Sequence, residues 1–515
     1  MHSNAILEWL YTSLGFENNT SFVVVLSAML VAFIVLKSLV NLLLYRYERD
    51  YIYALYRHLS RNLFMGYYAR GLQYIKSSNS AVLSRNVNAV CYTFIVGMLR
   101  PIATIACESL LLLLIFISIA IYSPMAALLS VAVFIPAAWL YHSLMRLRLN
   151  RYGKEENEAQ RKKYRNVTET YRGYADIEIN NAFAHQAEKF DEDLDTIIRV
   201  GSKNATISML PQNFTEVALA VGLALLVSLS VGFESENMKI LFGIFAVAAL
   251  RILPSIRTIL GAWSALRYNR YTVDILNENS NVAESAIVRD NTRLPFADSV
   301  ELRNLSFRFE DSEQMTIENL SLTIRKGEKV GINGASGAGK TTLLNLMLGL
   351  YTPTSGEILI DGVALKGEMV RKWQNSIGYV SQSIFLADDT LLANIAFGCD
   401  DKEVDMARIE RAVEAASLTE FVASLPNGLN SRIGECGALL SGGQRQRIGI
   451  ARALYKQADI LFFDEATSSL DSATEQSINR SIERLSADNE ELTIVVVAHR
   501  ESSLAYCDRV ITIEK

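Results

Sequence analysis

Cysteine is scarce in this chain, and its few copies form no recognisable pattern. There are five among 515 residues, namely Cys91, Cys107, Cys399, Cys436 and Cys507. No two of them have the close spacing of a zinc site, and five scattered thiols cannot supply the dense framework of a disulfide-stabilised domain. The sequence therefore excludes structural zinc and disulfide scaffolds, and it predicts isolated thiols in a reducing compartment.

The chain also lacks an excess of basic residues. Its 50 Lys and Arg residues are outnumbered by 55 Asp and Glu residues, which gives a formal net charge of -5 at pH 7. The isoelectric point is correspondingly low, near 5.8. Proteins that bind nucleic acid usually carry a basic surface. The charge balance therefore predicts no nucleic-acid partner.

Long apolar runs are absent beyond residue 298 but frequent before it. Hydrophobic residues make up 50% of the chain, and a helix needs about 20 mostly apolar residues to cross a bilayer. Five segments meet that requirement: 21–45, 101–122, 124–145, 213–232 and 238–262. Because 515 residues also exceed a single core, we predict a transmembrane domain over 1–274, a polar linker over 275–297 and a soluble domain over 298–515.

The distribution of Lys and Arg predicts the orientation of the membrane domain. These residues are frequent after the first and third apolar segments, within 46–85 and 146–165. Basic loops remain on the cytoplasmic side of a membrane, so we place both loops in the cytoplasm and the N-terminus outside. A multi-pass protein of the cell inner (plasma) membrane, with its soluble domain in the cytoplasm, is the predicted arrangement.

The soluble domain begins with a phosphate-binding loop, GASGAGKT, which fits the pattern GxxxxGK[ST] without a mismatch. In such a loop, backbone N–H groups surround the phosphates of a nucleotide, the lysine reaches them, and the hydroxyl after it faces Mg²⁺. The predicted nucleotide-binding residues of this segment are Gly334, Ser336, Gly337, Gly339, Lys340, Thr341 and Thr342.

A second motif, LSGGQ at 440–444, follows about a hundred residues later, and Asp464-Glu465 comes after it. With these motifs in this order, the chain resembles the ATP-binding cassette (ABC) proteins. In that family LSGGQ closes over the ATP held by a partner cassette. The resemblance therefore implies a second copy of the chain, a homodimer with nucleotide between the cassettes, and it adds Ser441, Gly442, Gly443 and Gln444 to the predicted ATP-binding residues.

The resemblance also implies roles for individual side chains. Phe309 would stack on adenine, where the family most often has tyrosine. Asp464, Thr341 and Gln382 would hold Mg²⁺. The carboxylate that follows the metal ligand would polarise the attacking water, and a histidine near the end of the chain would hold that carboxylate and the γ-phosphate. The predicted catalytic residues are Glu465, His499 and Gln382.

The fold that follows from this resemblance is a membrane α-helical bundle, with long helices extending into the cytoplasm, followed by an α/β P-loop NTPase cassette with a helical subdomain. The segment Gly434–Gly437 resembles a loop of exporters.

Exporter halves usually carry six membrane helices, so we expect the first of six to be missing from this sequence. The segments around Pro211 and Arg251 resemble bacterial flippases of lipid-linked oligosaccharides.

The charge of Arg251 is the main indication of a cargo. It lies roughly 18 Å into the bilayer at about 1.5 Å per residue, too deep to reach an interface easily. We expect it to face a polar cavity and to contact an anionic head group, unless a carboxylate such as Glu108 or Glu216 pairs with it.

The predicted function is ATP-driven export or flipping of a lipid-linked or amphipathic cargo by alternating access. Two alternatives remain: an exporter of peptides, bacteriocins or drugs, and an ATP-gated regulator that transports nothing. A soluble ABC ATPase acting on nucleic acid or ribosomes conflicts with the five apolar segments.

Overall fold

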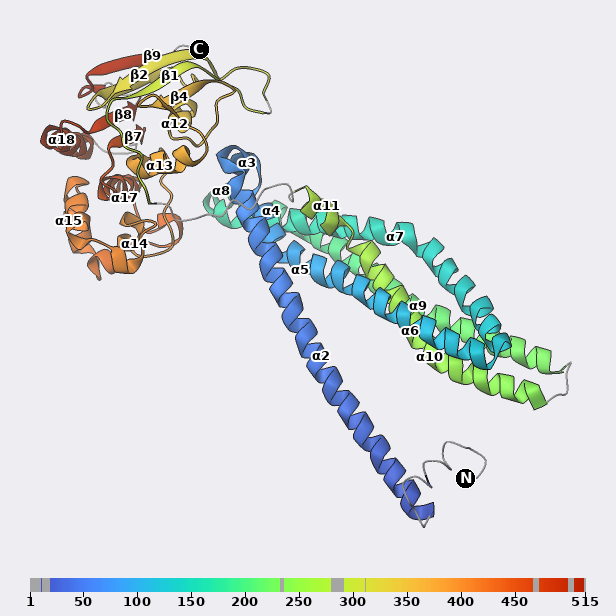
Figure 1. Ribbon diagram of the computed structural model, residues 1–515. Helices are drawn as coiled ribbons and strands as arrows, with labels where there is room; N and C mark the ends of the chain where they lie inside the picture. The colour runs from blue at the N-terminus through green and yellow to red at the C-terminus, as the bar shows by residue number, and fades with distance from the viewer. Residues whose placement is uncertain are drawn as a thin grey trace. The chain divides into compact units, whose positions relative to one another are not determined.

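The computed structural model describes residues 11, 19–231, 236–278, 291–310, 312–465, 472–498 and 504–513. The chain divides into two compact units (Figure 1), a helical unit, Met1–Arg70 with Tyr74–Ser285, and a second unit, Gly71–Gln73 with Ala286–Lys515. Most of the predicted linker lies outside the described residues, so the predicted domain boundaries remain a prediction.

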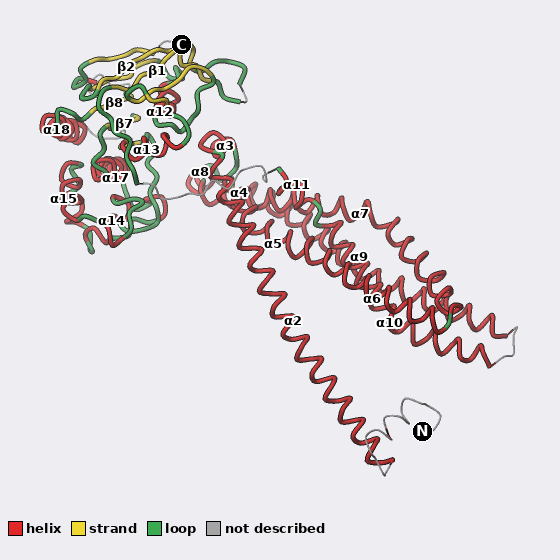
Figure 2. Tube along the Cα trace, viewed as in Figure 1, coloured by secondary structure: helices red, strands yellow, loops and turns green. Residues whose placement is uncertain are grey.

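The helical unit consists almost entirely of helices (Figure 2). Ser123 separates two of the longest. Its side chain accepts a hydrogen bond from the backbone N–H of Ala126, and Pro124 follows as the first residue of the next helix. The helices are α2 (Asn19–Ala69), α3 (Gly71–Ser77), α4 (Ser80–Arg85), the π-helical turns η1 (Asn86–Val90) and η2 (Ile95–Leu99) around α5 (Cys91–Phe94), α6 (Arg100–Tyr122), α7 (Pro124–Arg172), α8 (Tyr174–Ile179), α9 (Phe183–Val231), α10 (Glu236–Tyr268) and α11 (Tyr271–Asn277).

Four described helical stretches are long and apolar enough to cross a membrane: Thr20–Ala69, Ser80–Ile121, Pro124–Arg172 and Ile244–Tyr268. Each of them overlaps one of the five predicted spans, and two of those spans, 21–45 and 124–145, are contained completely. The fifth, 213–232, is the end of α9, and residue 232 lies outside the described part of the chain. Three of these stretches, Thr20–Ala69, Ser80–Ile121 and Pro124–Arg172, continue well past their apolar segments, as predicted. By contrast, α10 ends at Tyr268, six residues after its predicted span.

Two small clusters hold α7, α9 and α10 together. In one, Phe134 and Phe245 stack with ring centroids 6.5 Å apart. In the other, Tyr141 is fully buried, and its hydroxyl forms a 2.7 Å hydrogen bond with that of Ser264. By contrast, the most apolar stretch of α2 has no buried residue, and α2 diverges from the other long helices (Figure 1).

The second unit is an α/β domain with two sheets. The antiparallel sheet has the order β2-β1-β4-β5, and the parallel sheet has the order β6-β7-β8-β3-β9. The strands are β1 (Ser299–Phe307), β2 (Ile317–Arg325), β3 (Lys329–Gly334), β4 (Ser355–Ile360), β5 (Val363–Ala364), β6 (Ile377–Val380), β7 (Ile460–Asp464), β8 (Thr493–Val497) and β9 (Arg509–Ile513).

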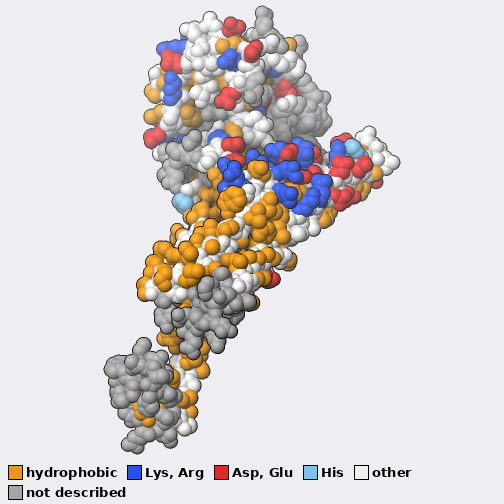
Figure 3. All heavy atoms as spheres, turned by 90° about the vertical axis from the view of Figure 1, so that its right-hand side faces the viewer, with side chains coloured by type: hydrophobic (Ala, Val, Ile, Leu, Met, Phe, Trp, Pro, Cys, Tyr) orange, Lys and Arg blue, Asp and Glu red, His pale blue; other side chains and the backbone are white. Residues whose placement is uncertain are grey.

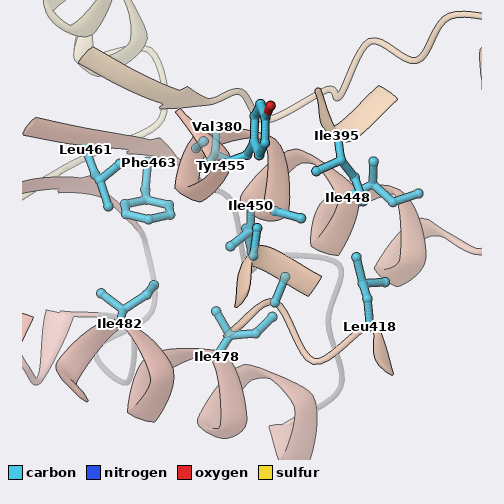
Figure 4. Packing of buried hydrophobic residues seen from close by; sticks show 14 of the residues in the cluster. Val380, Ile395, Leu418, Ile448, Ile450, Tyr455, Leu461, Phe463, Ile478 and Ile482 are labelled. Carbon is cyan, nitrogen blue, oxygen red and sulfur yellow. The ribbon is translucent and has the colours of Figure 1, made fainter. Parts of the chain in front are cut away.

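The helices of this unit are α12 (Lys340–Met347), α13 (Glu368–Ser376), α14 (Leu391–Ile395), α15 (Met406–Ala415), α16 (Thr419–Ser424), α17 (Gly442–Tyr455) and α18 (Ser472–Asp488), with short 3-10 turns η3 (Asp401–Glu403), η4 (Gly428–Asn430) and η5 (Glu435–Gly437). Helices α14 to α17 form the helical subdomain. Its apolar core is continuous with one face of the parallel sheet, where Ile448 and Ile450 of α17 share a cluster with Leu461 and Phe463 of β7 (Figure 4). The predicted fold class is confirmed for both units.

Candidate functional site

The phosphate-binding loop connects β3 to α12, the strand-loop-helix context that the motif requires. Three of its glycines have positive φ: Gly334 (152°), Gly337 (80°) and Gly339 (92°). A Cβ atom on Gly339 would lie 2.9 Å from the carbonyl oxygen of Thr316. The loop therefore needs glycine for its backbone path as well as for close approach to phosphates.

Lys340, the first residue of α12, is buried at 6% exposure. Its ammonium donates hydrogen bonds to the carbonyl oxygens of Gly334 at 2.9 Å and Ala335 at 3.0 Å. These contacts hold the charge inside the loop. Ser336 is exposed at the tip of the loop, and Thr342 lies in the first turn of α12.

Two oxygen atoms that were predicted as magnesium ligands meet beside the loop. The Thr341 hydroxyl donates to Oδ1 of Asp464 at 3.3 Å. Asp464 ends β7 and is 1% exposed, although its side chain is a carboxylate. A hydroxyl and a buried carboxylate are ligands that suit Mg²⁺, and a buried negative charge favours a cation nearby. The residues therefore fit the metal.

Glu465 lies at the same edge of the sheet. Its φ of 48° is in the left-handed region, which is uncommon for a residue with a side chain. The backbone N–H of Glu465 donates to the carbonyl oxygen of Val497 at 2.9 Å, and this bond holds the turn. Oε2 of Glu465 accepts a hydrogen bond of 2.7 Å from the Gln382 side chain. Two residues 83 positions apart are thus brought together.

Tyr379 is a neighbour that sequence reasoning missed. Burial, and secondly the charge of Asp464, raise the pKa of its hydroxyl, so this group stays protonated at neutral pH. In the sequence Tyr379 stands three residues before Gln382, and in the structure it lies on β6, which pairs with β7. A protonated phenol near the carboxylate adds no negative charge to the metal site.

The predicted adenine-stacking residue, Phe309, is half-buried and lies two residues after the end of β1. It contacts two aromatic rings edge-on, with centroids 5.0 Å from Phe307 and 5.8 Å from Tyr351. Tyr351 was not predicted from the sequence. The three rings form an aromatic cluster, and stacking of Phe309 on adenine remains a prediction.

The LSGGQ segment begins α17. Ser441 is its N-cap: the Ser441 hydroxyl accepts from the Gln444 N–H at 3.2 Å, and the Gln444 side chain accepts from the Ser441 N–H at 2.8 Å. Gly442 and Gly443 are the first helical residues. This gives a glycine-rich helix N-terminus, which favours phosphate. Among the described residues, no hydrogen bond joins it to the phosphate-binding loop of the same chain.

The predicted catalytic His499 lies outside the described residues, and so does the segment directly after Glu465. Their predicted roles remain predictions.

In the helical unit, Arg251 borders a hollow of about 580 Å³ between α6 and α10. The hollow is mainly apolar, with Ser118 and Arg251 as its polar residues, whereas the sequence predicted a polar cavity. Glu216, one of the suggested partners, instead lies 4.0 Å from Arg257. Among the described residues, no ion pair involves Arg251.

Comparison with known proteins places these observations in a family. Residues 317–468 match the family model described as ABC transporter. The chain is 31% identical to the ATP-dependent lipid A-core flippase of Ralstonia nicotianae over 413 residues, which are 79% of this chain and 68% of the relative. It is 32% identical over 391 residues to the protein of the same description from Cupriavidus pinatubonensis, covering 75% of this chain and 65% of the relative.

A solved structure has the same fold. It is described as a bacterial Atm1-family ABC exporter with ATP bound, and it superposes with a TM-score of 0.81 at 21% identity, over 98% of this chain and 88% of the other. The matched part of the present chain spans about two thirds of the length of the flippases. The order of the motifs, the two-unit architecture and these similarities agree, and the chain belongs to the ABC transporter family, as a transmembrane domain joined to an ATP-binding cassette.

Proposed function

We propose that this chain is one half of an ATP-driven exporter that moves a lipid-linked or amphipathic cargo with an anionic head group across a bacterial inner membrane. The observation that carries the proposal is the hydrogen bond between Gln382 and Glu465. It joins the predicted water-polarising carboxylate to a loop after β6, next to the Thr341 and Asp464 oxygens. A cassette that merely bound nucleotide would not need this second carboxylate.

Hydrolysis would proceed at this sheet edge. Thr341 and Asp464 would hold Mg²⁺, which when bound neutralises the charge of the phosphates. Lys340 and the loop N–H groups would orient the γ-phosphate. Glu465 would accept a proton from water, or orient that water, and Gln382 would fix the direction of the Glu465 carboxylate. His499 is proposed to complete the site.

A second copy would supply Ser441 and the N-terminus of α17 to the γ-phosphate. Each chain carries both the phosphate-binding loop and LSGGQ, so a homodimer would contain two complete sites. The exposed apolar surface of α2 supports a partner or lipid along that helix. Closing and opening of the two cassettes would then alternate the access of the membrane cavity.

The mixed character of the hollow beside Arg251 supports an amphipathic cargo. Its apolar wall, with Ile115 and Ile119 of α6 and Val247 of α10, suits an acyl chain, while the guanidinium suits a phosphate. The relatives named lipid A-core flippases favour a lipid over a peptide. The proposed location is the inner membrane, with the cassette in the cytoplasm.

Replacing Arg251 by leucine tests the cargo proposal, because it removes the charge without opening a large void. The variant should keep its fold and basal ATPase activity but lose cargo-stimulated ATPase activity and flipping of a lipid-linked oligosaccharide. Ser118→Ala, in the same hollow, is the control and should retain both. Unchanged flipping by a folded Arg251→Leu transporter would reject the head-group role and favour a peptide or neutral cargo. If the wild-type chain hydrolysed ATP but moved none of the tested cargoes, an ATP-gated regulator would be favoured.

A further inference from the structure

A second hollow lies in the helical unit, outside the apolar segments. It has a volume of about 630 Å³ and is bordered by α2, α3, α4, η1, α7 and α11. Five of the residues that line it are cations: Arg70, Arg85, Arg161, Lys162 and Arg165. Glu278 is the single acidic residue of the described lining. Figure 3 shows Lys and Arg side chains gathered at one end of the helical unit, next to its hydrophobic surface.

Arg85 is the buried cation of this hollow, with 7% of its surface exposed. Its Nη2 donates to Oδ1 of Asn157 at 2.7 Å, which is a neutral acceptor. Among the described residues, Arg85 takes part in no ion pair, and Glu156, the nearby carboxylate on α7, acts on it only through space. A buried guanidinium without a counter-charge is costly, and an anion in the hollow would offset that cost.

Asn86, the next residue, provides an independent indication. It is also 7% exposed, and its Nδ2 donates to the Tyr67 hydroxyl at 3.0 Å. Its Oδ1 is buried and has no hydrogen-bond partner in the described part of the chain. Asn86 opens the π-helical turn η1, an irregularity that often accompanies a functional position. The hollow thus combines cations with an acceptor that needs an O–H or N–H donor.

The distance from the membrane decides between a lipid and a soluble ligand. Tyr67 follows Leu44, the end of the apolar run of α2, by a length of roughly 35 Å at about 1.5 Å per residue. Arg161 follows Met145 on α7 by roughly 24 Å on the same basis. The head-group layer adds only about 5 to 8 Å to each side of the hydrocarbon core. A lipid seated in the bilayer cannot place its head group in this hollow.

We propose that the hollow binds a water-soluble phosphate ester that carries hydroxyl groups, of the sugar phosphate type. Arg85 would pair with a phosphate oxygen from inside, and Arg161, Lys162 and Arg165, all exposed, would attract the anion at the rim. Oδ1 of Asn86 would accept from a sugar hydroxyl. The proposal rests on the proposed function only for the position of the membrane, and not for cargo or hydrolysis.

Isothermal titration of the purified full-length chain with glucose 1,6-bisphosphate tests the site. All variants are made in a Lys340→Ala background, because the phosphate-binding loop could otherwise bind the probe. We expect saturable binding of one ligand per chain. Arg85→Gln should weaken it at least about tenfold, since a charge-assisted hydrogen bond is lost. Arg172→Gln, exposed on the same helix α7 but outside the hollow, should leave the affinity within twofold.

Arg85 is buried, so Arg85→Gln could lose binding through misfolding. A variant with substitutions only at the exposed rim tests the site without that risk. The triple substitution Arg161→Gln, Lys162→Gln and Arg165→Gln affects exposed side chains and should weaken binding and reduce its salt dependence. Asn86→Ala should weaken binding of the sugar phosphate more than that of inorganic pyrophosphate.

Three results would overturn the proposal. The first is the absence of saturable binding to the Lys340→Ala protein. The second is that the Arg85→Gln and rim variants bind the probe as tightly as the Lys340→Ala protein does. The third is binding of phosphatidylglycerol vesicles, sensitive to Arg85, without binding of the soluble probe. If the wild-type chain showed no ATPase activity or no flipping, the proposed function would be contradicted, but the result of this titration would still stand.

Discussion

The position of the Glu465 side chain depends on its own backbone. A positive φ of 48° turns the chain away from β7 directly after Asp464, and the N–H bond to Val497 holds that turn. The sequence identified both carboxylates through the family resemblance, because they follow the phosphate-binding loop and LSGGQ in that order. It could not predict the turn, since left-handed backbone at a glutamate follows from tertiary contacts and not from the residue type. It also gave no distance for the contact with Gln382.

Glu465→Gln is expected to lower ATP turnover by roughly 10² to 10⁴, the usual scale for a positioned base. The amide keeps the size of the side chain but cannot accept a proton, so ATP should still bind. Steady-state hydrolysis and nucleotide binding of the purified variant check this. Glu410→Gln, exposed on α15, is the matched control. Hydrolysis close to that of the wild type would reject the assignment of Glu465.

A second prediction at the residue scale concerns the reactivity of the Cys507 thiol. Burial, and secondly Asp508, raise the pKa of its thiol to about 11. Alkylation by iodoacetamide should therefore be slow at pH 8 and should accelerate only as the pH approaches that value, while the exposed Cys399 and Cys436 react at pH 8. In the unfolded chain the thiol has its ordinary pKa of about 9 and therefore ionises at a lower pH than in the folded protein. The free energy of unfolding should thus decrease as the pH rises from about 9 towards 11. Mass spectrometry of each peptide gives the rates, and equal rates at pH 8 would contradict the prediction.

At the scale of elements, helix α17 is the connection between the helical subdomain and the sheet. Its buried face packs in the cluster shown in Figure 4. Near its C-terminal end, Arg452 donates to the carbonyl oxygens of Asn394 at 2.8 Å and Phe385 at 2.9 Å, and its guanidinium lies 4.7 Å from the ring centre of Phe397. These contacts link α17 to α14 and to the loop that follows Gln382.

Arg452→Ala is expected to destabilise the protein by about 3 kcal/mol, because two or more charge-assisted hydrogen bonds to partly buried acceptors are lost. Thermal unfolding of the full-length chain should show a transition several degrees lower for this variant. Arg411→Ala, exposed on α15, should change it little. A shift of the same size in both variants would show that the contacts of Arg452 add no stability.

Apolar length predicted the membrane-spanning elements, but not every irregularity within them. Residues 460–463 form an uninterrupted apolar run, which is typical of a buried strand, and every residue of β7 is buried. The long helices were expected to leave the bilayer. The predicted span 124–145 already included Pro136, and α7 continues through it. The sequence did not reveal that π-helical turns interrupt the helix around α5. Neighbouring helices decide such features, and a single sequence does not report them.

At the scale of the whole molecule, the account requires two chains. Each cassette carries one phosphate-binding loop and one LSGGQ segment, and no hydrogen bond links them within the described part of one chain. The sequence predicted this division through the family resemblance, but neither composition nor periodicity indicates which surface a partner covers. The exposed apolar length of α2 is a surface that lipid or a partner would cover.

Mixing subunits tests this arrangement. Lys340→Ala and Ser441→Ala homodimers should each have both sites damaged. A heterodimer of the two should have one doubly damaged site and one intact site, because Ser441 acts on the nucleotide of the other chain. We therefore expect the mixture to recover part of the ATPase activity. A mixture as inactive as either parent would mean that Ser441 acts in its own chain or that the two sites are strictly coupled, and crosslinking across the dimer would separate these cases.

The central claim is that hydrolysis at Glu465 drives the movement of an anionic lipid cargo. The most direct measurement is the translocation of a fluorescent lipid-linked oligosaccharide in liposomes that contain the purified chain, followed with and without Mg·ATP. The account predicts translocation that requires ATP, is lost in Glu465→Gln and Arg251→Leu, and is retained in Glu410→Gln and Ser118→Ala. Translocation at the same rate without ATP, or none with ATP despite full ATPase activity, would contradict it.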